Sequence, residues 1–170
     1  MVKTPTTAIR NPRHLSKATG DILKAIHALQ DSERTSGETE NVLVALPSEI
    51  ADRTGTSRAF VTKMLKSMKE EGLVEYAPYR GVRLTPAGVR SATELSRHHR
   101  LLEYFCANTL GFSLEDAHAE AERLEHVISE EFEARLDTFL EYPQACPHGA
   151  PIPSPDEIYS EVPSEGRAAK

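Results

Sequence analysis

Six side chains that can bind a divalent metal ion recur at helical spacing in the second half of the chain. They are His99, Glu103, His118, Glu122, Glu125 and His126. Residues three and four apart share one face of a helix, so the spacing predicts that the side chains within residues 118–126 point to the same side. Charged groups on a packing face must be paired or must coordinate an ion. Imidazole and carboxylate ligands suit Mn(II), Fe(II), Co(II) or Zn(II), and the lack of a thiol in this set favours the harder ions.

The elements that must position these residues are helices. Proline after a threonine cap opens a helix predicted over residues 86–110, a capping-box pattern opens one over 113–127, and a serine cap opens one over 129–140. We therefore expect a helical metal-binding domain over residues 86–142. Residues 143–170 are rich in proline and predict a loop-like C-terminal tail, with about the last ten residues disordered.

The first half of the chain has the pattern of a winged helix-turn-helix. The predicted elements are, in order, a flexible basic arm (1–18), a helix from about residue 19, a polar loop (32–41), a short apolar segment that fits an edge strand (42–46), two helices (49–54 and 57–72), and a hairpin of two strands (73–77 and 82–85). Gly55 lies where the two helices of the turn must cross closely. We predict a mainly α fold, with a winged-helix DNA-binding domain over residues 19–85 followed by the helical domain.

The second helix of the turn is predicted to lie in the major groove of DNA, because the N-terminal end of such a helix reaches the base edges. The residues expected nearest the bases are Thr56, Ser57, Arg58, Ala59, Phe60 and Lys63. Lys66 on the same helix, with Arg80 and Arg83 on the wing, is expected to contact phosphates, which adds affinity without sequence information. The alternative is a winged helix that contacts another protein, with these cations simply solvated.

Charge is divided unevenly between the two halves of the chain. Residues 1–97 carry a net charge of +4 and residues 98–170 a net charge of −10. This division favours a polyanion-binding unit beside a unit that collects cations. We find no apolar run long enough to cross a bilayer, no secretory signal and only two cysteines, so we expect a cytoplasmic protein without a membrane partner.

Several segments together resemble a known family. The runs TGDILKAIHAL, TSRAFVTKMLKSMKEEGLV, YRGVRLTPAG, RHHRLLEYF, AERLEHVIS and CPHGAPIP occur in order over roughly residues 18–153. They are similar to the diphtheria toxin repressor family, and most similar to its manganese-type branch. The resemblance implies a homodimeric, DNA-binding transcriptional repressor of metal-homeostasis genes rather than an enzyme, with the metal as corepressor.

The resemblance also implies which residues bind the metal. It assigns a primary site to Asp21, Glu122, Glu125 and His126, and an ancillary site to His99, Glu103 and His118. The oxygen ligands at positions 21 and 122 imply Mn(II), with Fe(II) as the alternative.

Three features depart from the manganese-type pattern. Lys24 occupies the position of a second carboxylate on the first helix, and the ancillary set resembles that of the iron-type members. The chain ends soon after the segment PIPSP, as in the two-domain members, which implies a form without the family's SH3-like domain. Cys146 and His148 could form a further metal pair, but the corresponding family segment is a surface loop, and we favour that interpretation.

In this interpretation the ion joins the DNA-binding half to the helical half and so fixes two recognition helices about 34 Å apart on a palindromic operator. The expected dimer contact uses Leu101, Leu102, Phe105, Leu124, Val127, Ile128 and Phe132. One alternative is an iron-dependent repressor of the same family. A second is a di-metal carboxylate enzyme, of whose two required Glu-x-x-His motifs only Glu115 to His118 is present. A third is a winged-helix regulator that senses something other than a metal.

Overall fold

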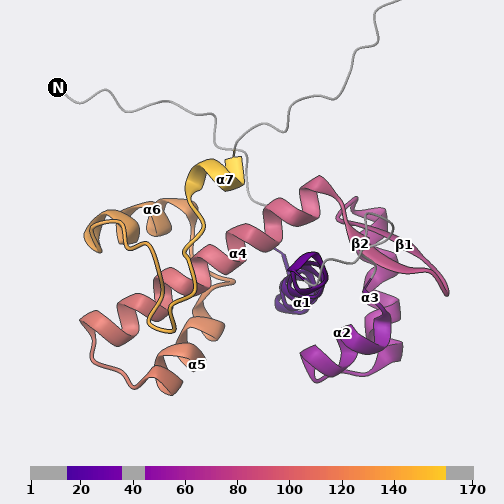
Figure 1. Cartoon of the computed structure of the whole chain (residues 1–170), viewed down its shortest axis with the longest axis horizontal. Coiled ribbons are helices and arrows are strands. Elements are labelled where there is room, and N and C mark those ends of the chain that lie inside the picture. The colour runs from indigo at the N-terminus through magenta and orange to yellow at the C-terminus, as the bar shows by residue number, and fades with distance from the viewer. Residues whose placement is uncertain (1–14, 36–44, 160–170) are drawn as a thin grey trace, which may run out of the picture.

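The computed structural model describes residues 15–35 and 45–159. Its elements are α1 (Lys17–Thr35), α2 (Pro47–Thr54), α3 (Arg58–Glu70), β1 (Val74–Ala77), β2 (Gly81–Leu84), α4 (Pro86–Tyr104), η1 (Phe105–Thr109), α5 (Leu114–Leu124), α6 (Glu130–Phe139) and α7 (Pro155–Tyr159). Two lobes are joined by the long helix α4, with α1 beside it (Figure 1). The mainly helical fold with a two-stranded wing is the predicted one. The predicted arm (residues 1–14) and the end of the chain (160–170) lie outside the described residues.

The first lobe, here called the winged-helix unit, comprises α1 to β2. Gly55 ends α2 in the left-handed conformation (φ 63°), and Ser57 caps α3 by accepting a hydrogen bond from the Phe60 amide at 3.2 Å. On α3, Val61 is fully buried, whereas Phe60, which is expected to lie near the bases, is exposed. The core packs the buried faces of α1, α2 and α3 against the wing.

The wing is an antiparallel pair in which Val74 faces Leu84 and Tyr76 faces Val82. Ala45 pairs with Val82 on the other edge of β2 through two backbone hydrogen bonds of 3.0 and 2.9 Å. The chain before α2 therefore approaches the sheet as an edge, as the apolar segment 42–46 predicts, although residues 42–44 lie outside the described part of the chain.

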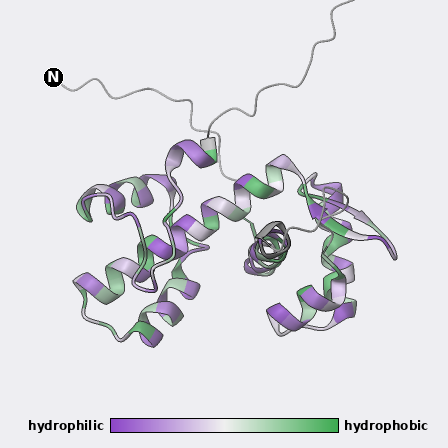
Figure 2. Cartoon of the chain, viewed as in Figure 1, coloured by the Kyte–Doolittle hydropathy of each residue, from purple (hydrophilic) through white to green (hydrophobic). Residues whose placement is uncertain are grey.

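The second lobe, here called the helical unit, contains most of α4 and everything after it. The helix predicted over 86–110 is α-helical only to Tyr104, because the next turn is the wider π-helix η1. Helix α5 also ends earlier than predicted, at Leu124 rather than near residue 127. Hydrophobic and hydrophilic residues alternate along the helices of both lobes, as amphipathic packing requires (Figure 2).

The core of the helical unit shows that part of the expected dimer contact was wrong. Leu101 and Leu102 are buried inside the chain against Ala121, Leu136 and Ile152. They pack within one protomer and cannot form its outer surface. Val127 and Phe132, from the same predicted set, are exposed.

The proline-rich segment over residues 143–159 is attached to the fold more firmly than its composition suggests. It ends in α7, which packs against α4, and Ile152 and Ile158 are buried. Two arginines of α4 donate to its backbone, Arg97 to the Pro153 carbonyl at 2.7 Å and Arg100 to the Pro151 carbonyl. No helix among the described residues has the length and apolar character needed to span a membrane.

Candidate metal centre

The residues predicted to bind metal meet where α1 of the winged-helix unit packs against α4, which in turn packs against α5 of the helical unit. The structure arranges them in three neighbouring groups. These are Asp21, Glu125 and His126; His99, His118 and Glu122; and Glu103, Cys146 and His148. Within each group the potential ligand atoms lie within 4.8 Å of one another. All seven side chains of the predicted ligand set are present in these groups.

The first group joins the two units. His126 Nε2 lies 3.2 Å from an Asp21 oxygen and 3.0 Å from a Glu125 oxygen. Asp21 is on α1, whereas Glu125 and His126 follow α5. Glu125 ends α5 with helical backbone angles, and from this last turn the side chains of Glu125 and His126 both reach α1.

Glu125 is the most deeply buried carboxylate of the site, with 1% of the residue exposed. One of its oxygens lies 2.7 Å from His99 Nδ1, which connects the first group to the second. Burial alone would raise the pKa of Glu125, but hydrogen bonds from His126 and His99 and the charge of Lys24 hold that pKa well below its ordinary value. Glu125 is therefore a carboxylate anion across the physiological pH range.

The second group departs from the predicted division into primary and ancillary sites. His99 Nε2 lies 3.1 Å from His118 Nδ1, and Glu122 joins these two imidazoles rather than the group around Asp21. Glu122 and His118 are both substantially exposed. The outer part of the centre is thus open to solvent, and the inner part around Glu125 is closed.

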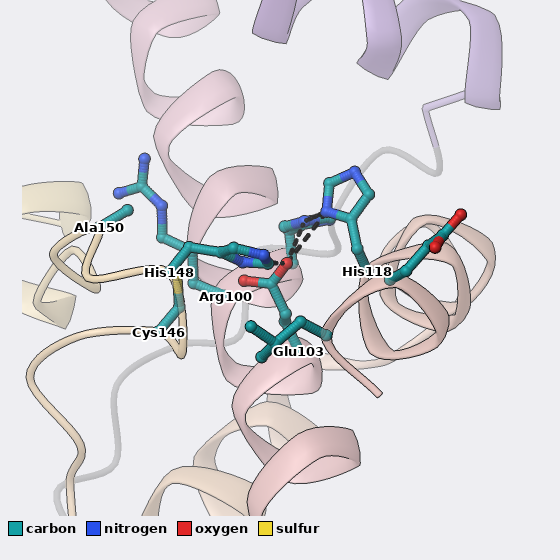
Figure 3. A pocket seen from close by; sticks show the side chains of 9 residues that line it. Arg100, Glu103, His118, Cys146, His148 and Ala150 are labelled. Atoms are coloured by element: carbon teal, nitrogen blue, oxygen red, sulfur yellow. Dashed lines mark hydrogen bonds and ion pairs between the residues drawn. The ribbon is translucent and has the colours of Figure 1, made fainter. Parts of the chain in front are cut away.

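The third group includes two residues that sequence reasoning set aside. The Glu103 carboxylate lies between His118 Nδ1 at 3.0 Å and His148 Nδ1 at 3.1 Å (Figure 3). Cys146, which is buried, donates a hydrogen bond to the same carboxylate. The pKa of the Cys146 thiol is raised by burial and by the hydrogen bond to Glu103. The CPHG segment is a surface loop, as expected, with Cys146 buried and His148 exposed; its Cys-x-His spacing was the available signal for the contact with Glu103.

This third group lines an open pocket of about 490 Å³, together with His99, Arg100 and Glu115. Burial alone would raise the pKa of Glu103, but hydrogen bonds from Cys146, His118 and His148 lower it below its ordinary value. An anionic carboxylate with imidazole and thiol neighbours is a donor set that a divalent ion can use.

Two lysines of α1 supply positive charge to the centre. Lys24 Nζ lies 2.5 Å from a Glu125 oxygen and 3.4 Å from a Glu122 oxygen. Lys17 Nζ lies 3.3 Å from an Asp21 oxygen. The position that departs from the manganese-type pattern thus places an ammonium group among the carboxylates.

The residues around His126 fit a divalent ion. Its Nε2 faces two carboxylate oxygens that can only accept, so a proton or a cation must lie between them. Its Nδ1 is the one buried side-chain nitrogen or oxygen in the described part of the chain that has no hydrogen-bond partner. Two oxygens and one imidazole suit Mn(II) or Fe(II).

The predicted DNA-contacting residues lie together on the outer face of α3 and the wing. Every one of them is exposed: Thr56, Ser57, Arg58, Ala59, Phe60, Lys63, Lys66, Arg80 and Arg83. Three already have partners within the chain: the Thr56 hydroxyl bonds to that of Thr54, the Ser57 hydroxyl caps α3, and Arg83 forms an ion pair with Glu75. Tyr79, which sequence reasoning missed, is fully exposed at the tip of the wing beside Arg80.

Fold and site together define a winged-helix protein with a potential metal centre between its DNA-binding lobe and a helical lobe. The N-terminal DNA-binding domain of the iron dependent repressor family matches residues 14–82. Its metal binding and dimerisation domain matches residues 85–154. The chain belongs to this family, which comprises transcriptional repressors rather than enzymes.

Individual relatives agree with this assignment. The diphtheria toxin repressor of Corynebacterium diphtheriae is 37% identical over 119 residues, which cover 70% of this chain and 53% of that protein. The transcriptional regulator MntR of Escherichia coli O6:H1 is 38% identical over 125 residues, covering 74% and 73% of the two chains. The chain spans about half the length of the curated diphtheria toxin repressors it matches.

Solved structures are similar as well. The manganese regulator SloR has a TM-score of 0.67 at 40% identity, covering 80% of this chain and 59% of that one. A manganese-dependent transcriptional repressor in complex with manganese has a TM-score of 0.63 at 36% identity, covering 78% and 59%. Relatives named for iron, such as the iron-dependent repressor IdeR of Mycobacterium tuberculosis, thus occur beside relatives named for manganese.

Proposed function

We propose that this chain is a metal-activated transcriptional repressor, with Mn(II) as the preferred corepressor and Fe(II) as the alternative. The observation that carries the proposal is the contact between the two lobes at the candidate metal centre. Asp21 of the winged-helix unit lies 3.2 Å from His126 of the helical unit, and both lie beside the buried anion Glu125. A divalent cation supplies the positive charge that holds these groups together.

The chain's own residues explain how binding at this centre reaches the DNA. Asp21 is on α1, whose buried residues Ile22, Leu23 and Ile26 pack in the same core as α3. Fixing Asp21 against residues 125 and 126 therefore fixes the recognition helix relative to the helical unit. A shift of the DNA-competent population from about 1% to 99% needs roughly 5.5 kcal/mol of preferential binding.

The surface of the helical unit supports a homodimer. Large hydrophobic residues are exposed on or next to η1, α5 and α6: Leu110, Phe112, Leu114, Val127, Phe132, Phe139 and Tyr142. Apolar side chains in that number indicate a surface that another copy of the chain covers. Two-fold symmetry of such a dimer then implies a palindromic operator. The family resemblance points to a cytoplasmic regulator of metal-homeostasis genes.

Donor chemistry favours Mn(II) over other ions in the first group (Asp21, Glu125 and His126), because two carboxylates and one imidazole form a hard ligand set without sulfur. Fe(II) has similar preferences and is the runner-up. The thiol of Cys146 belongs to the separate group around Glu103 and does not enter this comparison.

Selection of DNA by the full chain tests the proposal. The protein is incubated with a random pool of DNA duplexes at fixed salt, in parallel with Mn(II) and with a chelator, and retained duplexes are sequenced. We expect an inverted repeat to be enriched only with Mn(II). Equal enrichment in both arms, or none in either, would contradict the proposal.

A further inference from the structure

Helix α4 carries two buried cationic residues that belong to none of the three metal-ligand groups. Arg97 and His98 are only 3% and 6% exposed, and they face Glu133 and Asp137 of α6, which are also buried. Arg97 Nε lies 2.5 Å from a Glu133 oxygen, and its Nη2 lies 2.6 Å from an Asp137 oxygen. Buried charge clusters are costly unless every member is paired, so this one needs a reason beyond packing.

His98 connects this cluster to the candidate metal centre. Its Nε2 lies 3.0 Å from the second Glu133 oxygen, and its Nδ1 lies 3.2 Å from the main-chain carbonyl of Glu125. The carboxylate and the carbonyl can only accept hydrogen bonds, so both ring nitrogens donate. His98 thus bridges α6 and the residue at which α5 ends.

The main-chain carbonyl of Glu125 lies at the end of α5. The Glu125 amide still bonds to the Ala121 carbonyl as in a helix, whereas the amides of Val127 and Ile128 both turn back to the Leu124 carbonyl. The last turn of α5 closes here, and Glu125 and His126, which lie in it, both contact residues of α1. A side chain that holds the Glu125 carbonyl therefore holds the backbone between two metal-ligand candidates.

We propose that His98, held by Glu133, is a positioning residue of the metal centre that fixes the end of α5 so that Glu125 and His126 face Asp21. Arg97 completes the cluster by pairing with Glu133 and by binding the Pro153 carbonyl. Helix α6 and the C-terminal segment thereby hold α4 and the end of α5 in place, with α5 and α6 flanking α4 (Figure 1). The inference rests on the proposed metal-dependent function.

Calorimetric titration with Mn(II) tests this role in the full chain. The variants are His98→Leu, which removes both donors, and His98→Gln, whose amide can still donate. Residues that orient ligands change metal affinity by about 10–100-fold. We expect His98→Leu to weaken the Mn(II) dissociation constant by about that factor, and His98→Gln to weaken it less. The electron paramagnetic resonance spectrum of bound Mn(II) should change in the same order.

His27→Leu is the matched control, because this α1 histidine is half-buried and pairs with Asp31 away from the centre. If His98→Leu fails to fold, Glu133→Gln, which keeps the size of the cluster, provides the same comparison. Unchanged affinity and spectrum in a folded His98 variant, with normal binding by the unmodified chain, would overturn the positioning role alone. Absence of Mn(II) binding by the unmodified chain would overturn both this role and the proposed function.

Discussion

Lys24 places a positive charge of the protein beside the carboxylates of the candidate metal centre. Its ammonium group lies 2.5 Å from Glu125 and 3.4 Å from Glu122, and its side chain is only 20% exposed. A cation on the protein offsets repulsion among the carboxylates, and it also occupies space and charge that a bound ion would use. Lys24 should therefore stabilise the metal-free fold while limiting the affinity for a metal.

Replacement of Lys24 by methionine separates these two effects. Loss of the partner of a buried carboxylate should lower the unfolding free energy of the metal-free chain by roughly 1–3 kcal/mol. Mn(II) should then raise the melting temperature by more than it does in the unmodified chain, as measured by thermal unfolding with and without the ion. Lys66→Met, on the exposed face of α3, is the control. A smaller Mn(II)-induced rise in Lys24→Met would contradict this account.

Individual ligands were predictable where helical spacing governs them. The recurrence of histidine and glutamate over residues 99–126 predicted a cluster, and the structure brings these side chains together. The grouping was not predictable, because it depends on where α5 ends. Cys146 and His148 lie more than 40 positions from Glu103, and only tertiary packing of the C-terminal segment brings them to it.

At the scale of elements, the close packing of α4 on the wing is a strict requirement. A β-carbon added at Gly88 would lie 2.1 Å from the Leu73 carbonyl oxygen, a backbone atom that cannot move aside. Gly88 thus allows the first turn of α4 to approach the start of β1, which sets the direction in which α4 leaves the winged-helix unit.

Gly88→Ala should consequently destabilise the chain by about 1–3 kcal/mol, the usual cost of overpacking. Urea denaturation followed by circular dichroism measures the change. The neighbouring Val89→Ala, at an exposed position, should stay within about 0.5 kcal/mol of the unmodified chain. Equal urea midpoints for Gly88→Ala and Val89→Ala would show that the contact between Gly88 and the Leu73 carbonyl does not limit how closely α4 packs on the wing.

Starts of helices were predicted better than their ends. Ser57, Thr85, Ser113 and Ser129 each cap a helix through a local side-chain hydrogen bond, and the capping pattern is visible in the sequence. The π-helix at Phe105–Thr109 and the early end of α5 have no such signal. In the second case a distant side chain, His98, bonds to the carbonyl at the helix end.

At the scale of the whole molecule, the uneven charge of the two halves and the exposed apolar residues of the helical unit both fit the proposed function. The basic half contains α3 and the wing, and the acidic half contains most of the candidate ligands. The ring of Phe139 lies 6.3 Å from that of Phe105, so the exposed apolar surface is continuous with the core of the helical unit. The proposed dimer through this surface leaves α3 and the wing uncovered, because they lie in the other lobe (Figure 1).

Phe139→Asp tests the dimer surface. An introduced charge cannot be buried without a partner, so we expect the dimer to dissociate at micromolar concentration, as measured by sedimentation velocity. Operator affinity should fall with it, because one recognition helix then binds alone. Tyr79→Asp, at the wing tip, should leave the dimer intact. A Phe139→Asp variant that remains dimeric would place the interface elsewhere.

The most direct test of the central claim is the Mn(II) dependence of DNA binding by the unmodified chain and by Asp21→Asn. Fluorescence anisotropy with the duplex enriched by selection, at one fixed salt concentration, measures both. We predict that Mn(II) tightens binding by the unmodified chain roughly 5–150-fold, the range of a coupling energy of 1–3 kcal/mol. Asp21→Asn should keep its melting temperature without metal and lose this tightening. Equal tightening in both proteins would contradict the claim that an ion joins Asp21 of the winged-helix unit to Glu125 and His126.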